Sequence, residues 1–212
     1  MKNFLAIDTS CEYFTAVAAK DGEIFTSFLA DCAMKHSVSL LPAIDELLQR
    51  ANLRLEDCDF FAAVVGAGSF TGIRIGISAI KGFCSALGKP ALPVTSFDVA
   101  AYNTMSRTDG KLLCLVDAGH DAYYACGYGE QGEIVYPPAY ITEAEALALQ
   151  ADGYTLCATS DLPLGSKAEL KIVDPVVGLQ NATLALSKRG AFGELDALYI
   201  RKSSAELNQG GK

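Results

Sequence analysis

Two aspartates are the residues whose type and spacing could do chemistry in this sequence. Asp8 and Asp117 lie 109 positions apart, and each ends an apolar run that is followed by polar turn residues. Two carboxylates that face one cleft could hold a metal bound to phosphate or position a nucleophile. Aspartate is also a common turn residue that bonds nearby amides. The spacing alone favours this structural role.

A glycine-rich segment, VVGAGSFTGIRIGISAIKGF at 64–83, is the second candidate. It is no Walker A loop, because Gly68 to Gly72 is one residue too short and Ile73 stands where lysine is needed. A dinucleotide fingerprint lacks its third glycine at Thr71. The segment therefore predicts a strand, then a glycine turn, then a helix capped by Ser69 or Thr71. Such a turn can bind an anion, but taken alone the loop favours tight packing.

Histidine and cysteine offer little chemistry. His36 and His120 are the two histidines, and position 40, one helical turn after the first, is Leu40. A metal centre or a catalytic triad is therefore not expected. His36 and Ser37 are instead expected to begin a helix, with Ser37 as its cap. The seven cysteines lie singly, without C-x-x-C spacing, and are expected to be reduced thiols in small apolar holes.

Composition limits the partners that the protein can hold by itself. The chain has 212 residues, half of them hydrophobic, and a net charge of −8. Gripping a nucleic acid requires clustered Lys and Arg, so a partner is expected to supply any basic surface. No apolar run approaches the roughly 20 residues that span a bilayer, and the start of the chain lacks a secretory apolar region. We expect a cytoplasmic protein without a membrane segment.

The elements that position the aspartates repeat along the chain. Three strands with tight turns are expected over 4–30, and the same layout, with GEI again after the second turn, is expected over 111–140. Alternating helices and strands follow each meander. Helices are expected over 36–53, 71–88, 97–106, 142–150 and 182–190, and strands over 59–68, 91–96, 154–160 and 170–175.

This pattern predicts two α/β lobes with mixed sheets, the second one reduced. The polar turn at 106–111 favours an N-terminal lobe over 1–106 and a C-terminal lobe over 107–206. Residues 207–212 are expected to be a disordered tail.

The helix expected over 71–88 is apolar nearly all round. One stripe holds Ile73, Ile77 and Ile80, and a second, small and flat, holds Gly72, Gly76, Ala79, Phe83 and Ala86. Such a helix is normally buried, either in a large core or against a partner that approaches the glycines. Both interpretations stay open.

Several segments, in order, resemble the bacterial TsaB (YeaZ) family. The resemblance runs from Phe4 to about Glu206 and rests on FLAIDTS, HSVSLLPAIDELL, GAGSFTGIRIG, VDAGHDAYY and LYIRKSSAE. It implies a fold like actin, sugar kinases and heat-shock chaperones. It departs at Ala67 and Ala197, where the family usually or often has proline, and the first departure is expected to loosen the turn.

The resemblance also implies a role in making N6-threonylcarbamoyladenosine in tRNA, beside the anticodon of tRNAs that read codons beginning with A. It implies a non-catalytic subunit that pairs with the catalytic TsaD and supports binding of the ATPase TsaE. TsaD holds its metal with two histidines, which match His36 and Leu40 here. No tightly bound cofactor is therefore expected, ATP or ADP is expected only in the complex, and tRNA only through it.

The resemblance implies that the two helices after 37 and after the glycine turn contact TsaD. The expected partner-binding residues are Leu41, Ile44, Leu48, Ser69, Phe70, Thr71, Gly72, Arg74, Ile75, Gly76, Ala79 and Phe83. A vestigial phosphate cleft would involve Asp8, Thr9, Ser10 and Asp117.

Three rivals stay open. One is a small Mg/ATP-dependent phosphotransferase that uses Asp8 and Asp117, whose nucleotide binding Asp8→Asn would abolish. Another is a peptidase, for which the sequence offers neither a triad nor a zinc pair. The third is a homodimer through the same glycine-faced helix, which is compatible with the subunit role when the partner is absent.

Overall fold

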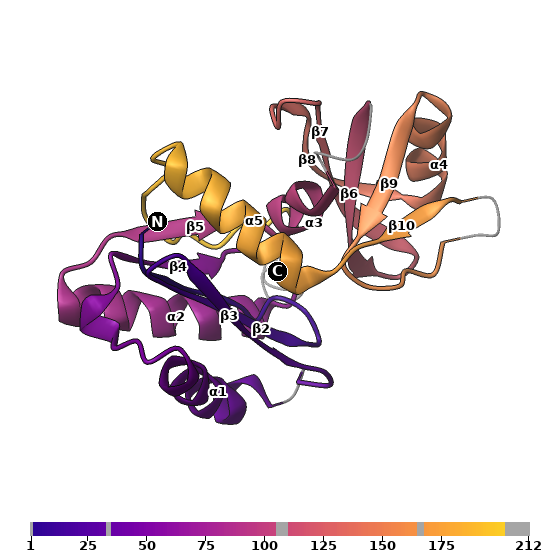
Figure 1. Ribbon diagram of the computed structural model, residues 1–212. Helices are drawn as coiled ribbons and strands as arrows, with labels where there is room; N and C mark the ends of the chain where they lie inside the picture. Colours follow the sequence, from indigo (N-terminus) through magenta and orange to yellow (C-terminus); the bar gives the residue numbers. More distant parts are fainter. Residues whose placement is uncertain (1, 33–34, 105–109, 165–167, 202–212) are drawn as a thin grey trace, which may run out of the picture.

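The chain forms two five-stranded sheets, each with its own helices. The computed structural model describes residues 2–32, 35–104, 110–164 and 168–201 (Figure 1). The strand orders are β3-β2-β1-β4-β5 and β10-β9-β6-β7-β8. In each sheet three antiparallel strands are extended by two parallel ones. This repeated arrangement confirms the two α/β lobes with mixed sheets that the repeated pattern predicts, and it agrees with the actin-like fold that the resemblance implies.

The strands alternate with helices along the chain. The first sheet consists of β1 (Phe4–Asp8), β2 (Phe14–Lys20), β3 (Glu23–Leu29), β4 (Phe60–Val64) and β5 (Ala91–Val94). The second consists of β6 (Lys111–Gly119), β7 (Ala122–Tyr128), β8 (Ile134–Thr142), β9 (Tyr154–Ala158) and β10 (Leu170–Ile172). The helices are α1 (His36–Arg50), the 3-10 turn η1 (Leu55–Asp57), α2 (Phe70–Leu87), α3 (Ser96–Thr104), α4 (Glu143–Ala151) and α5 (Pro175–Lys188).

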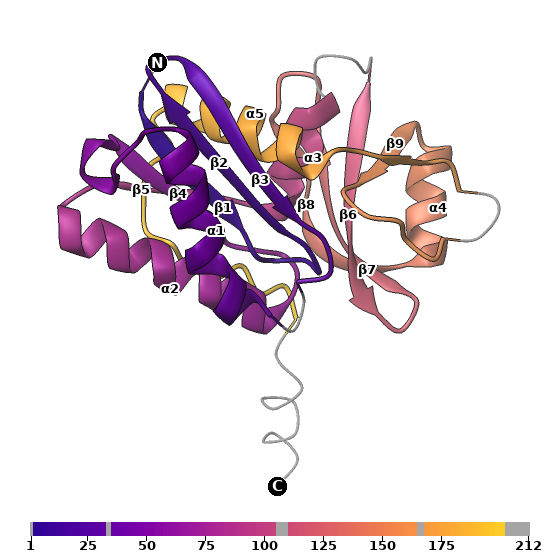
Figure 2. The same cartoon turned by 60° about the horizontal axis from the view of Figure 1, so that its bottom comes forward.

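The first sheet is covered on both faces, which explains why β4 and the first four residues of β1 are continuously apolar. Leu5 and Ile7 of β1 point to the core under α1 and α2, whereas Phe4 and Ala6 point to the core under α5. Figure 2 shows α1 and α2 in front of this sheet and α5 behind it. The sheet therefore holds α1 and α2 side by side on one face.

The segment after the second sheet returns to the first lobe. Helix α5 packs against β1, β2 and β5. Beyond it, the amide of Gly193 donates to Ala91 O at 3.0 Å and the amide of Leu198 donates to Val65 O at 2.7 Å. The predicted boundary at 106/107 separates the two sheets, but it assigns α5 and the segment after it to the second lobe although they pack on the first. The expected tail at 207–212 lies outside the described residues.

The predicted ends of α2 are confirmed, whereas the predicted cap of α1 and the predicted start of α5 are wrong. Ser69 caps α2, accepting the amide of Gly72, and Gly88 ends that helix in the left-handed conformation (φ 64°), as predicted. The predicted Ser37 cap is wrong, because α1 already begins at His36 and has no side-chain cap. The predicted start of α5 at residue 182 is also wrong, because the helix begins at Pro175 after an Asp174 cap.

All seven cysteines are free thiols.

Candidate protein-interaction site

The glycine turn packs against the loop that follows Asp8. A Cβ at Gly68 would overlap the Ser10 carbonyl, and a Cβ at Gly72 would overlap the Thr9 carbonyl. The amide of Ser69 donates to Ser10 O at 2.7 Å, and Thr9 Oγ1 donates to Gly72 O at 2.7 Å. The glycines therefore let two segments of the same chain approach closely, which is the packing role that the loop sequence favours.

Gly72 and Gly76 do not form an outward face. Both are buried, and a Cβ at Gly76 would overlap the side chain of Thr9. Their prediction as partner-binding residues is wrong, because these glycines make room for β1 and the loop after it. Beside this turn, the Ala67 carbonyl accepts a hydrogen bond from Ser96 Oγ and the neighbouring Gly66 carbonyl accepts the Ser96 amide.

Asp8 is enclosed by its own loop. Its side chain is 1% exposed, and its Oδ1 accepts the Ser10 amide at 2.8 Å and the Ser10 hydroxyl at 2.7 Å. Burial raises its pKa, against the lowering effect of these hydrogen bonds. Asp117 is exposed, and its Oδ1 accepts the Gly119 amide at 2.8 Å. Both aspartates thus do the structural work of a turn residue.

We expect Asp8→Asn to fold and to remove a pH dependence of stability. Because the pKa of Asp8 is raised in the folded state, its contribution is greatest below the ordinary carboxyl pKa and falls as the pH rises through the raised value. Asparagine can accept the Ser10 hydrogen bonds without a buried charge. Urea unfolding between about pH 3 and pH 8 should show the variant gaining stability over the wild type as the pH rises. A difference that does not vary with pH would contradict this role.

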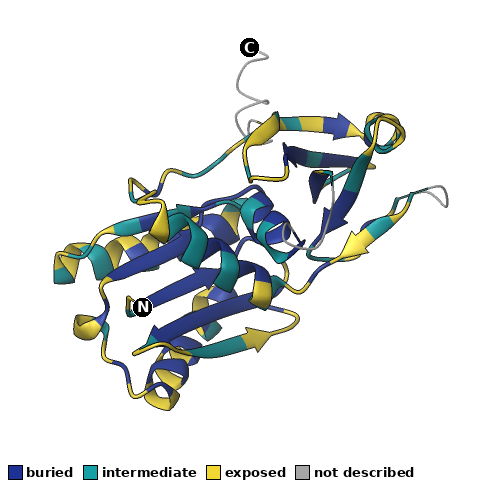
Figure 3. Ribbon diagram, turned by 45° about the horizontal axis from the view of Figure 1, so that its top comes forward, coloured by how far each residue is buried: buried dark blue, intermediate teal, exposed yellow. Residues whose placement is uncertain are grey.

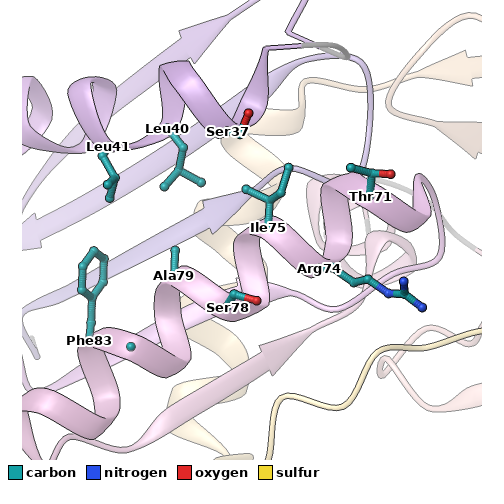
Figure 4. Close-up of a pocket in the computed structure, with 10 residues that line it drawn as sticks. Ser37, Leu40, Leu41, Thr71, Arg74, Ile75, Ser78, Ala79 and Phe83 are labelled. Carbon is teal, nitrogen blue, oxygen red and sulfur yellow. The ribbon is translucent and has the colours of Figure 1, made fainter.

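A groove lies between the outer faces of α1 and α2. Its volume is about 750 Å³. Figure 4 shows Leu40 and Leu41 of α1 facing Ile75, Ala79 and Phe83 of α2. The lining residues are Ser37, Leu40, Leu41, Thr71, Arg74, Ile75, Ser78, Ala79, Gly82 and Phe83.

Half of the predicted partner-binding residues line this groove. They are Leu41, Thr71, Arg74, Ile75, Ala79 and Phe83. Sequence reasoning missed Ser37, Leu40, Ser78 and Gly82, although continuing each helical stripe by three or four residues would have found them.

The other predicted residues lie elsewhere. Ile44 (3% exposed) and Leu48 (8% exposed) are buried in the core of the first lobe. Their placement at a partner surface is wrong, because they lie on the face of α1 that packs on the sheet. Ser69 caps α2, and Phe70 stacks on Tyr199.

The groove leaves apolar side chains of both helices partly exposed. Within the described part of the chain, α2 is the one helix long and apolar enough to cross a membrane, yet only 28% of it is buried. Its inner face packs on β4, so α2 is a surface helix of this lobe and not a membrane span. On α1, Val38 is 75% exposed and Leu41 is 56% exposed. Figure 3 shows buried strands in the first sheet and exposed positions on the helices around it. A contiguous apolar patch of this kind is typical of an interaction site.

His36 lies at the start of α1. It is 3% exposed, and its Nε2 lies 2.9 Å from Cys11 O. Its Nδ1 has no hydrogen-bond partner among the described residues. One turn on, Leu40 contributes an apolar wall where a second ligand would be needed. The described residues hold no group of three metal-ligating side chains.

These features define an actin-like chain whose glycine turn is filled by its own loop and whose two adjacent helices leave an apolar groove open. A family model described as "TsaD: tRNA N6-adenosine threonylcarbamoyltransferase" matches residues 30–186. The match covers well over half of the chain, which therefore belongs to this family. TsaB (YeaZ) proteins are among the relatives that the chain resembles.

Individual relatives agree with this assignment. The chain is 32% identical over 135 residues to a tRNA N6-adenosine threonylcarbamoyltransferase from Kosmotoga olearia, covering 55% of this chain and 41% of that one. It is 32% identical over 115 residues to the tRNA threonylcarbamoyladenosine biosynthesis protein TsaB of Buchnera aphidicola, covering 54% of each. The chain thus spans about half or less of these curated relatives. A solved YeaZ structure from Pseudomonas aeruginosa has a TM-score of 0.78 and 25% identity, covering 94% of this chain and all of that one.

Proposed function

We propose that this protein takes part in forming N6-threonylcarbamoyladenosine in tRNA as a non-catalytic, activating subunit. It pairs with a TsaD-type catalytic subunit through the groove between α1 and α2. The observation that carries the proposal is an apolar groove of about 750 Å³ on a helix that is 28% buried. An apolar surface of this kind gains free energy when a second protein covers it.

Membership of the family that the TsaD model describes, and similarity to TsaB (YeaZ) proteins, support the choice of pathway and partner. In this proposal the paired subunits also present a binding site for a TsaE-type ATPase. The complex, and not this chain alone, binds tRNA, because a chain with a net charge of −8 lacks the clustered cations that bind nucleic acid. In this proposal the complex acts in the cytoplasm.

The phosphotransferase alternative has little support at the glycine turn. Asp8 Oδ1 already accepts hydrogen bonds from the amide and hydroxyl of Ser10, and the Ser69 amide already donates to Ser10 O. A phosphate would have to displace these bonds between close-packed segments of the chain. We therefore propose that the protein alone holds no nucleotide tightly and that ATP or ADP binds only in the complex.

Deleting the gene tests this function. The modified nucleoside, measured by mass spectrometry of digested tRNA, should fall strongly in the deletion strain and return when the wild-type gene is supplied. A normal level in a clean deletion would refute the proposed pathway. ATP binding by the purified chain, lost in Asp8→Asn, would instead support the phosphotransferase.

A further inference from the structure

Arg74, at one end of the groove, is held in place by two aromatic rings. The rings of Phe70 and Tyr199 stack with centroids 4.1 Å apart and planes at 2°. The guanidinium carbon lies 5.1 Å from the Phe70 centroid and 5.7 Å from the Tyr199 centroid. Its Nε donates to the Tyr199 hydroxyl at 2.9 Å. A cation placed over aromatic faces in this way is stabilised and restricted in its rotamers.

The other donors of this guanidinium are free to bind. Within the described ranges, neither Nη1 nor Nη2 of Arg74 has a hydrogen bond to the protein, and Arg74 forms no ion pair. The sequence from Phe60 to Gly88 contains no acidic residue. Arg74 is exposed, and Figure 4 shows its side chain extending from α2 away from Leu40 and Leu41. An acidic protein thus displays, beside its apolar groove, a fixed cation that has no carboxylate partner among the described residues.

We propose that Arg74 binds a carboxylate of the TsaD-type partner, an inference that rests on the proposed function. The two free nitrogens of a guanidinium form a planar fork that matches a carboxylate, with two parallel hydrogen bonds. Phe70 and Tyr199 are positioning residues that fix the fork before the partner arrives, which lowers the entropy cost of binding. The apolar groove supplies contact area, and Arg74 supplies register and charge complementarity.

A carboxylate suits this place better than an RNA phosphate. Affinity for RNA comes from several cations along one surface. In the described part of the chain, the outer face of α2 carries two cations, Arg74 and Lys81, in a protein with a net charge of −8. One oriented fork at the end of an apolar groove is instead typical of a protein interface, where arginine is among the residues that dominate affinity.

The test is the dissociation constant of the complex with the purified TsaD-type subunit, at about 50 mM and about 500 mM NaCl. Arg74→Gln should weaken binding roughly tenfold or more at low salt and should lose most of the wild-type salt dependence. Lys81→Gln, which removes the other cation of α2, should bind as the wild type does. Tyr199→Phe keeps the ring but removes the Nε acceptor, and should weaken binding by roughly a few fold. Equal melting temperatures would show that these variants remain folded.

Other outcomes separate the two proposals. If Arg74→Gln binds the subunit with wild-type affinity and salt dependence, the carboxylate contact is refuted and the subunit role stands. If the variant keeps that affinity but the complex no longer retains tRNA, Arg74 serves an RNA phosphate and the carboxylate contact is again refuted. If the wild type does not bind the subunit, the proposed function itself fails, and the carboxylate contact fails with it.

Discussion

Ala79→Arg in α2 is expected to abolish stable association with the TsaD-type subunit and to leave the fold intact. Ala79 lines the groove and points toward α1 (Figure 4). An arginine there would fill the groove and place an unpaired charge in an apolar contact. The cost should be about 2–4 kcal/mol of binding free energy, or roughly 30- to 1,000-fold in the dissociation constant. Titration calorimetry and co-elution would measure it.

A matched control is Ala148→Arg on α4, an exposed alanine of a helix in the second lobe. It adds the same charge and volume outside the groove and should bind the subunit as the wild type does. Circular dichroism should give the same helix content for both variants. Wild-type affinity in Ala79→Arg would rule out the groove as the contact. Equal losses in both variants would point to a general effect of added charge.

Gly72→Ala is expected to destabilise the chain severely, although it adds only a methyl group. The new Cβ would overlap the Thr9 carbonyl, which is backbone and cannot move aside cheaply. We expect a loss of about 3 kcal/mol or more. For a chain of this size that loss lowers the melting temperature by roughly 6–12 °C, measured by calorimetry or circular dichroism.

Gly82→Ala on the same helix is expected to stabilise the chain, in contrast to Gly72→Ala. Apart from its chain neighbours and the backbone of its own helix turns, no atom of the described chain lies within 4 Å of a Cβ at Gly82, so alanine brings its higher helix propensity without a clash. Stability should rise by about 1 kcal/mol. Equal effects at Gly72 and Gly82 would contradict the packing of the turn on Thr9.

Gly76→Leu would also test folding and not partner binding, because its side chain would collide with Thr9.

The fold was predictable because its signals are local and repeated. The strand, aspartate and turn pattern occurs twice, and Ser69 and Gly88 mark the two ends of α2 by residue type alone. The start of α5 shows the limit of such signals. Asp174 followed by Pro175 is a standard helix start, but the apolar residues before it favour a strand, and the sequence after 175 carries only a weak helical stripe. The return of α5 to the first sheet depends on tertiary packing that no local pattern encodes.

The site was predictable only in part, because a helix that is apolar all round does not reveal which face is inside. Gly72 and Gly76 suit a partner helix and their own chain equally well, and the decisive neighbour, Thr9, lies 63 positions before Gly72. The hydrogen bond from Arg74 Nε to the Tyr199 hydroxyl likewise joins residues that are 125 positions apart. Leu41 and Ala79 were named because the family resemblance implies that the helices carrying them contact a partner, and both residues line the groove.

Reconstituted threonylcarbamoylation of tRNA tests the central claim most directly. The TsaD-type subunit, the TsaE-type ATPase, threonylcarbamoyl-adenylate and tRNA would be combined with no added chain, with the wild type, with Ala79→Arg or with Ala148→Arg. We predict that modification requires this chain and that the wild type and Ala148→Arg support it while Ala79→Arg does not. Full modification without the chain, or equal support by Ala79→Arg, would contradict the account.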